Sequence, residues 1–401
     1  MTAITLTHKI RLDPTYKQEK YFRQACGVAR FTWNWGLSEW KRQFACGGKP
    51  SGLKLKKQFN AIKPVEFPWT YDVTKYASQQ PFIFLQSAFR RFFSKQACYP
   101  KFKKKGVHDS FYIGNDHFRL AGKKIRIPRL GWVRMREALR FTGRVVSATV
   151  SRIADMWFVS LNVELSQPPL PCESQAGVGV DLGIRKLATL FDGKGVTEVE
   201  GPKPLGNLIK KLRRLQRQLS RRENGSRNRW KARIKVARLH YRIACIRQDG
   251  LHKLTTFLTA NYRTIAIEDL NVKGMMGNRR LARSIADMGF HEFRRQLEYK
   301  AKMRGNHIEP ASRWFPSSRR CSWCCMVNDS LTLGDRVFAC SHCGRTMDRD
   351  LNAAINLLSL STVSSTGFEA CGEEGSGSGA TLSETGLCEA GTEPCIDLCT
   401  F

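Results

Sequence analysis

Four cysteines in the last third of the sequence have the spacing of a metal site. Cys321 and Cys324 form one Cys-x-x-Cys pair, and Cys340 and Cys343 form a second pair after fifteen intervening residues. Two such pairs are typical of a tetrahedral zinc site with four thiolate ligands. A closed site of this kind has no open position for a substrate, so we predict a structural zinc ion. Cys325 directly follows Cys324, but only Cys324 keeps the two-residue spacing.

A second group of candidate ligands consists of acidic residues that lie far apart in the sequence. Asp181 ends the apolar run VGV, and Glu268 ends the run IAI. Asp350 stands at the start of an Ala/Leu/Ile-rich helix, with Asp348 two residues before it. A buried, unpaired carboxylate is costly, so three of them together favour a bound divalent cation. Mg²⁺ prefers oxygen ligands, and a pair of such ions can promote phosphodiester hydrolysis.

Each of these acids also has a structural interpretation. Asp is a favoured N-cap, so Asp350 could simply begin its helix. The run GVGVDLG is a poor dinucleotide-binding loop, because its last glycine is out of register and Asp181 would face a pyrophosphate. A serine hydrolase has less support still, because the sequence has no Gly-x-Ser-x-Gly motif.

The net charge indicates a polyanionic partner. The 401 residues carry a formal charge of +33, which nucleic acid explains best. An anionic membrane is the alternative, but there is no apolar run of about 18 residues and no signal-peptide core. We therefore expect a cytoplasmic protein without a membrane partner. Its 14 cysteines are then expected to be reduced thiols and metal ligands.

The positive charge is concentrated in one helical region, residues 205–248. Apolar residues recur with helical spacing on both sides of the break RENGSRN, which predicts two antiparallel amphipathic helices. Between Lys210 and Arg247 the only acid is Glu223, whereas a solvated helix usually carries both signs. We expect the charged face to contact phosphate groups. Its candidate nucleic-acid contacts are Lys210, Arg213, Arg214, Arg217 and Arg221.

The elements before this region form a β module that is interrupted by helices. Residues 3–12 alternate as in a strand, and the strand period returns over 108–165. Between them, residues 16–105 are helix-like and rich in aromatic side chains. The Pro-rich segment 166–175 then predicts a domain boundary.

The elements that carry the acids follow this boundary. Residues 177–193 have the pattern of a hairpin, and 263–270 that of a short buried strand ending on two acids. Residues 278–305 predict a long basic helix. Residues 361–401 contain seven acids and no Lys or Arg, and they are rich in Ser, Gly and Thr. We predict that this tail is disordered and that its cysteines are free thiols.

In combination, these motifs resemble the TnpB family, the transposon-encoded RNA-guided nucleases related to type V CRISPR effectors. The similarity extends over nearly all of 1–358. It implies a RuvC-like nuclease domain with an RNase-H-like core, whose catalytic acids match Asp181, Glu268 and Asp350. The resemblance therefore selects Asp350 over Asp348. The motifs are GVDLGIRKLATL, IAIEDL, NRRLARSIADMGFHEFRRQLEYKA, FPSSRRCSWC and CSHCGRTMDRDLNAAINL.

The resemblance also implies a multidomain α/β architecture. A zinc ribbon is inserted in the nuclease domain, and a helical recognition domain is inserted in a β-barrel wedge domain. The expected boundaries are 1–15 and 106–166 for the wedge domain, 16–105 for the recognition domain, 167–309 and 344–360 for the nuclease domain with its basic hairpin 205–248, 310–343 for the zinc ribbon, and 361–401 for the tail.

Partners and cofactors follow from the same resemblance. They are a guide RNA from the transposon end, double-stranded target DNA, structural zinc and catalytic Mg²⁺, with a monomer bound to its RNA. The segment VTKYASQQ is similar to the helix that reads a short target-adjacent motif, which makes Lys75, Tyr76 and Gln79 candidate DNA contacts. The family's usual glycine after the second zinc cysteine is Cys325 here.

We therefore expect a guide-RNA-directed DNA endonuclease of a transposable element that hydrolyses phosphodiester bonds with Mg²⁺. One alternative is an RNA-guided repressor that binds DNA without cutting it. Another is a transposase or an accessory protein of DNA transposition. The presence of all three acids favours the enzyme.

Overall fold

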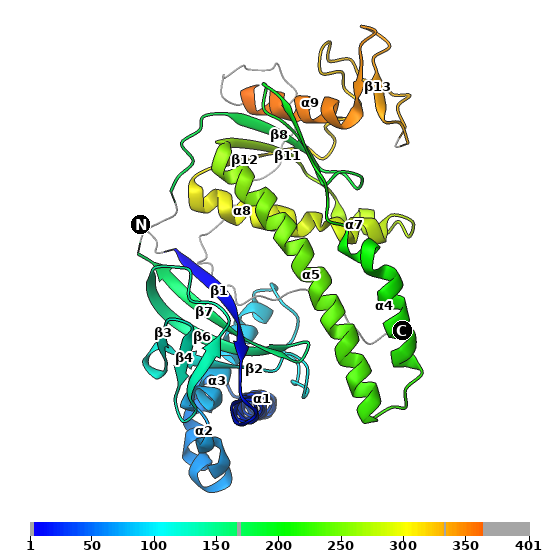
Figure 1. The fold of residues 1–401 in the computed structure, drawn as a ribbon. Helices are drawn as coiled ribbons and strands as arrows, with labels where there is room; N and C mark the ends of the chain where they lie inside the picture. Colours follow the sequence, from blue (N-terminus) through cyan, green and yellow to red (C-terminus); the bar gives the residue numbers. More distant parts are fainter. Residues whose placement is uncertain (1–3, 167–169, 333, 364–401) are drawn as a thin grey trace.

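The computed structural model describes residues 4–166, 170–332 and 334–363, and it confirms a multidomain α/β fold. Figure 1 shows one unit built on a large antiparallel sheet and a second unit built on a smaller mixed sheet, with a short β-ribbon beside its last helix. That helix extends three residues into the predicted tail, and the rest of the tail lies outside the described residues. No helix in the described ranges has the length and apolar character needed to span a membrane.

The N-terminal unit is a seven-stranded sheet with the order β2-β6-β7-β1-β5-β4-β3. Strand β1 lies between β7 and β5, so the first strand of the chain pairs with strands that follow the helical insertion. The two edge strands of this sheet, β2 and β3, do not pair with each other among the described residues. The bounds are Thr5–Asp13 (β1), Ser110–Gly114 (β2), Arg119–Ala121 (β3), Lys124–Ile127 (β4), Gly131–Met135 (β5), Gly143–Ile153 (β6) and Met156–Leu165 (β7).

Three helices are inserted between β1 and β2. The first begins at Thr15, whose side chain accepts from the N–H of Gln18 while the Gln18 side chain accepts from the N–H of Thr15. Aromatic rings fill the core between the helices, and Trp40 stacks on Phe89 with ring centroids 4.1 Å apart. The bounds are Tyr16–Ala45 (α1), Gly52–Glu66 (α2) and Lys75–Phe93 (α3), with short 3-10 helices at Pro68–Asp72 and Asn115–His117.

The second unit contains a five-stranded sheet with the order β10-β9-β8-β11-β12. Strands β8, β11 and β12 are parallel, so their carboxyl ends meet at one edge of the sheet. Both central strands are buried on their apolar positions, as the runs VGV and IAI predict. The bounds are Gly177–Asp181 (β8), Ala188–Phe191 (β9), Val196–Val199 (β10), Thr264–Glu268 (β11) and His307–Ala311 (β12).

Helices cover both faces of this sheet (Figure 1). Leucines of α5 and aromatic residues of α8 pack on one face, and α9 packs on the other through Leu357. The bounds are Pro204–Ser220 (α4), Arg227–Asn261 (α5), Val272–Met276 (α6), Ala282–Met288 (α7), Phe290–Arg304 (α8) and Arg349–Val363 (α9), with the ribbon strands Val337–Ala339 (β13) and Thr346–Asp348 (β14).

The long basic helix predicted over 278–305 is in fact two helices, α7 and α8. Gly289, at φ +73°, separates them, because a left-handed residue ends a helix. The break places the buried carboxylate of Asp287 beneath α4, where it accepts from the N–H groups of Leu205 and Gly206. Arg247 of α5 also pairs with Asp287, at 3.4 Å. This junction fixes both helices of the basic hairpin to the sheet unit.

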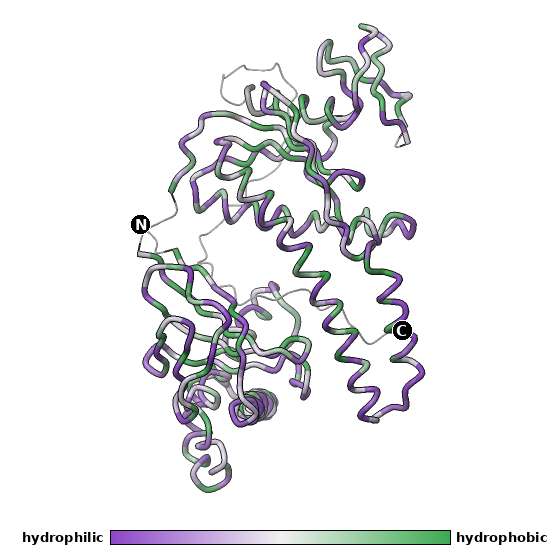
Figure 2. The backbone as a smooth tube through the Cα atoms, in the orientation of Figure 1, coloured by the Kyte–Doolittle hydropathy of each residue, from purple (hydrophilic) through white to green (hydrophobic). Residues whose placement is uncertain are grey.

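The basic hairpin itself is α4 and the first half of α5, which project from the sheet unit (Figure 1). Its apolar residues face inward, and Leu212 of α4 packs against Val236 and Leu239 of α5. Arg229 closes the turn by donating to the carbonyl groups of Leu219 and Arg222. Figure 2 shows the resulting alternation of hydrophobic and hydrophilic residues along both helices.

Helix α9 approaches strand β8 most closely at Gly179. A Cβ atom there would overlap the carbonyl oxygen of Ala354 and lie 2.6 Å from the main-chain nitrogen of Leu358. Both neighbours are helix backbone and cannot rotate away. The position therefore requires glycine, which lets α9 lie directly against the sheet.

We predict that Gly179→Ala lowers the free energy of unfolding by about 3 kcal/mol, because the new methyl group forces α9 away from β8. Thermal or denaturant unfolding of the purified variant measures the change. Gly195→Ala is the matched control, since a Cβ atom there meets nothing within 4 Å. Equal stability of the two variants would contradict the close packing of α9.

Candidate active site

Two of the candidate acids lie side by side at the carboxyl edge of the parallel strands. Val180 of β8 is in register with Ile267 of β11, and the next residues in the two strands are Asp181 and Glu268. Both side chains are partly buried. The carboxyl edge of parallel strands is where open α/β sheets bind their ligands.

Helix α9 brings the third acid to the same edge. Asp350 lies one turn before Ala354, the residue that contacts Gly179. Asp348 has a different role, because its side chain accepts from the N–H groups of Asp350 and Leu351 at 2.9 and 3.1 Å. Asp348 is therefore the helix cap. This leaves the Asp350 carboxylate available to interact with the other two acids.

The electrostatics show that the three carboxylates are mutual neighbours. Burial, followed by the charges of Glu268 and Asp350, raises the pKa of Asp181 well above its ordinary value. Burial is also the main cause of the raised pKa of Glu268. Arg349 opposes both shifts and lies 3.7 Å from Asp350. The ionised carboxylates are unfavourable in this site unless a counter-ion is present. The site is therefore suited to a divalent cation.

Two residues of this site were not predicted from the sequence. The hydroxyl of Ser317 donates to Oε1 of Glu268, and Arg349 acts on all three acids. Both lie within motifs that carried the family resemblance, FPSSRRCSWC and CGRTMDRDLNAAINL. Nothing in the residue types alone distinguishes Ser317 from Ser318, or Arg349 from other arginines.

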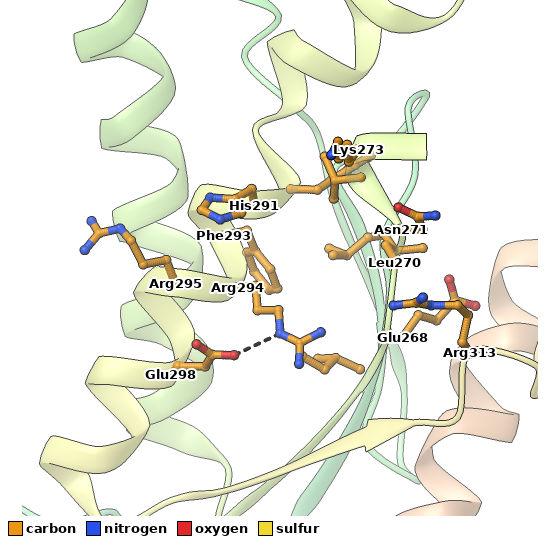
Figure 3. Close-up of a pocket in the computed structure, with 14 residues that line it drawn as sticks. Glu268, Leu270, Asn271, Lys273, His291, Phe293, Arg294, Arg295, Glu298 and Arg313 are labelled. Carbon is orange, nitrogen blue, oxygen red and sulfur yellow. Dashed lines mark hydrogen bonds and ion pairs between the residues drawn. The ribbon is translucent and has the colours of Figure 1, made fainter. Parts of the chain in front are cut away.

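A cavity of about 390 Å³ opens beside the acids, with Glu268 in its wall (Figure 3). The second acid of the motif IAIEDL, Asp269, does not join the cluster. It pairs instead with Arg294 and with Arg313, the latter at 2.8 Å. Arg294 also pairs with Glu298 at 2.8 Å, so the wall of the cavity combines paired arginines with Lys273 beside the acidic cluster.

The four predicted zinc ligands form a compact cluster. Their sulfur atoms all lie within 4.8 Å of one another, and the Cys321–Cys343 and Cys324–Cys340 pairs are 3.7 and 3.5 Å apart. A tetrahedral ion with Zn–S bonds of about 2.3 Å requires sulfur separations of roughly 3.8 Å. The cluster can therefore hold zinc.

Cys325 is not part of this cluster. It is exposed and adopts φ +62°, just as Gly344 adopts φ +72° after Cys343. The N–H of Cys325 donates to the carbonyl of Cys321, and that of Gly344 to the carbonyl of Cys340, both at 3.0 Å. The two knuckles thus have the same turn, and Cys325 occupies a left-handed position that favours glycine.

The candidate DNA contacts lie at the start of α3 and are only partly together. Lys75 and Gln79 line one cavity of about 330 Å³, with His117 and Arg129. Tyr76 donates its hydroxyl to Asp116 at 2.5 Å and packs against Gly114, and Lys75 pairs with the same Asp116 carboxylate at 3.1 Å. The Tyr76 side chain therefore connects the start of α3 to the N-terminal sheet.

The candidate contacts of the basic hairpin are all exposed. Within the described residues none of them forms an ion pair, so their charges remain available to phosphate groups. They are Lys210, Arg213, Arg214, Arg217 and Arg221.

Comparisons with known proteins were made over the whole chain. The chain is 36% identical over 385 residues to "Putative RNA-guided DNA endonuclease InsQ" of Escherichia coli (strain K12), covering 91% of this chain and 93% of the relative. The chain belongs to the TnpB family. A relative in Streptomyces pristinaespiralis, "Putative RNA-guided DNA endonuclease", is 35% identical and covers 93% of this chain and 92% of its own length. The resemblance found in the sequence is thereby confirmed.

Family models match three parts of this TnpB chain. "Probable transposase" matches residues 160–279, "Cas12f1-like, TNB domain" matches 290–357, and "Helix-turn-helix domain" matches 1–49. The last description does not fit the local structure, because the described part of this range, residues 4–49, contains the strand β1 and the long helix α1. Among solved structures, "Structure of the mini-RNA-guided endonuclease CRISPR-Cas_phi3" aligns with a TM-score of 0.47 at 11% identity, covering 92% of this chain and 94% of that chain.

We predict that Asp181→Asn stabilises the metal-free protein at neutral pH by about 1–2 kcal/mol, because it removes a charge from the acid cluster. The folded-state pKa of Asp181 is raised, so the wild type loses stability as the pH rises from the ordinary aspartate pKa up to the raised folded-state pKa. The advantage of the variant should vanish below about pH 4. Unfolding curves across pH measure it. Mg²⁺ should stabilise the wild type more than the variant, and an equal effect would contradict the site.

We predict about one zinc ion per chain, retained in Cys325→Ser and lost in Cys324→Ser. The reason is that the Cys324 sulfur faces the cluster, whereas Cys325 lies outside it. Elemental analysis of the purified variants provides the measurement. Loss of zinc from both variants, or from neither, would show that the ligand set is different.

Proposed function

We propose that this TnpB-family chain is a guide-RNA-directed DNA endonuclease of a transposable element. The observation that carries the proposal is the convergence of Asp181, Glu268 and Asp350 from three distant segments at one sheet edge. The names of its relatives, which describe RNA-guided DNA endonucleases, support the same activity. In this proposal the second unit is a RuvC-like nuclease domain with an inserted zinc ribbon, and the first is a wedge domain with an inserted recognition domain.

The three carboxylates would hold Mg²⁺, whose chemistry is to activate water and stabilise the leaving oxygen of a phosphodiester. The chain's own residues provide the setting for that chemistry. Arg349 limits the repulsion among the acids, and Ser317 binds one oxygen of Glu268. Arg294 and Arg313 line the adjoining cavity and are suited to a phosphate beside the one that is cut.

Recognition would be divided between RNA and protein. Guide pairing reads the target sequence, while the protein binds the backbone and a short flanking motif. The exposed cations of α4 would contact the RNA or the heteroduplex, and Lys75 and Gln79 would face the DNA motif. The acids sit in a chain of net charge +33, so the same molecule attracts a polyanion and provides a local site for cations.

The test begins with RNA that copurifies with the protein, which is sequenced to define the guide. The protein–RNA complex with Mg²⁺ should cleave a matched duplex, and Asp181→Ala should reduce the rate by about 10³-fold or more. Glu200→Ala is the control, because this acid of the same unit is exposed and forms no ion pair within the described part of the chain.

Three results would contradict the proposal in different ways. Undiminished cleavage by Asp181→Ala would refute the catalytic site. Tight binding of matched DNA without cleavage by the wild type would favour the repressor. Joining of transposon ends without guide RNA would favour the transposase.

A further inference from the structure

Among the described residues, Ser317 provides a hydroxyl that contacts an acid of the candidate site. It donates to Oε1 of Glu268, and the residue is only 4% exposed. It lies four residues before Cys321, at the entrance to the first zinc knuckle. The neighbouring Ser318 forms no hydrogen bond with Glu268 in the described part of the chain. The contact therefore depends on where the main chain places the side chain, and not only on the presence of a serine.

Two asparagines of α9 hold Ser317 and the residues after it. Asn352 and Asn356 are one helical turn apart and are 0% and 3% exposed. Asn356 donates Nδ2 to the carbonyl oxygens of Ser317 and Arg320 at 2.7 and 2.6 Å. Asn352 donates to Arg320 at 2.7 Å and accepts from the N–H of Ser322 at 3.0 Å. Both amides therefore bind the same short segment, 317–322.

The segment 317–322 connects the two metal sites. Cys321 lies within it, and Asp350 lies on the helix that holds it. If the segment left α9, these buried polar groups would lose their hydrogen-bond partners, which is unfavourable. Glu268, Asp350 and the first zinc knuckle are thus joined by one buried polar connection.

We propose that Ser317 is a positioning residue for Glu268, and that Asn356 holds Ser317 in the place where it can act. This inference rests on the proposed function, because Glu268 matters only as a ligand of the catalytic cation. A hydroxyl bound to Oε1 restricts rotation of the carboxylate and leaves Oε2 free to bind the ion. Hydrogen bonds to a ligating carboxylate commonly contribute 10- to 100-fold to metal affinity.

The test measures metal binding without RNA or DNA. Mn²⁺, which takes the same oxygen ligands as Mg²⁺, is titrated into the zinc-loaded full chain and followed by electron paramagnetic resonance. Asp181→Ala gives the baseline of Mn²⁺ bound elsewhere. We expect Ser317→Ala to weaken Mn²⁺ binding about tenfold or more. Ser317→Thr, which keeps the hydroxyl, should restore most of the affinity, and Ser318→Ala should leave it unchanged.

Asn356 is tested by a double-mutant cycle. Asn356→Ala should weaken Mn²⁺ binding in the wild type but add little to Ser317→Ala, because it acts through the same contact. The zinc content of each variant is measured in parallel and should remain near one ion per chain.

The proposal is overturned if Ser317→Ala binds Mn²⁺ as the wild type does, if Ser318→Ala loses as much affinity, or if Ser317→Ala loses its zinc. Cleavage by the guide-loaded complex is a separate readout. A protein that never cleaves DNA but loses Mn²⁺ affinity on Ser317→Ala would refute the proposed function while supporting the positioning role.

Discussion

The second unit must accommodate the repulsion between like-charged carboxylates at one edge of its sheet, and its other features follow from this constraint. Asp181 and Glu268 are adjacent because β8 and β11 are parallel and in register, and Asp350 joins them because α9 lies against Gly179. Burial and mutual repulsion raise the pKa of both strand acids. The surrounding residues offset only part of the electrostatic repulsion between the carboxylates, so the remaining negative charge favours a bound cation.

The same constraint explains how charge is distributed over the rest of the molecule. Several acids outside the cluster pair with basic side chains, as Asp269 does with Arg294 and Arg313. In the basic hairpin, by contrast, the cations of α4 form no ion pair among the described residues, and the base of the hairpin is fixed through the buried Asp287. The carboxylates at the sheet edge and the cations of α4 are thus two sites of uncompensated charge. The first favours a bound cation, and the second favours the phosphate groups of a nucleic acid.

Sequence patterns predict those features that depend on local periodicity and motif spacing. They predict the central strands, the amphipathic hairpin and the four-cysteine cluster, because each leaves a regular pattern in the residue types. The prediction of one long helix over 278–305 was wrong, because Gly289 adopts a left-handed conformation that ends the first helix. The roles of Asp348 and Asp350 could not be separated by spacing, because both are aspartates at a helix start. Ser317 and Asn356 could not be found at all, since their partners are main-chain groups and a distant carboxylate.

The packing of α9 against β8 has a consequence for the synthesis of the chain. The glycine that receives the helix is translated long before the helix itself, so this contact has a large sequence separation. A nascent or truncated chain that stops before Arg349 contains both sheets and the basic hairpin but lacks the third acid. Such a product could still bind nucleic acid, yet it would have no complete hydrolytic centre. On the proposed assignment of the three acids, the order of the elements would delay nuclease activity until the ribosome has made almost the whole described chain.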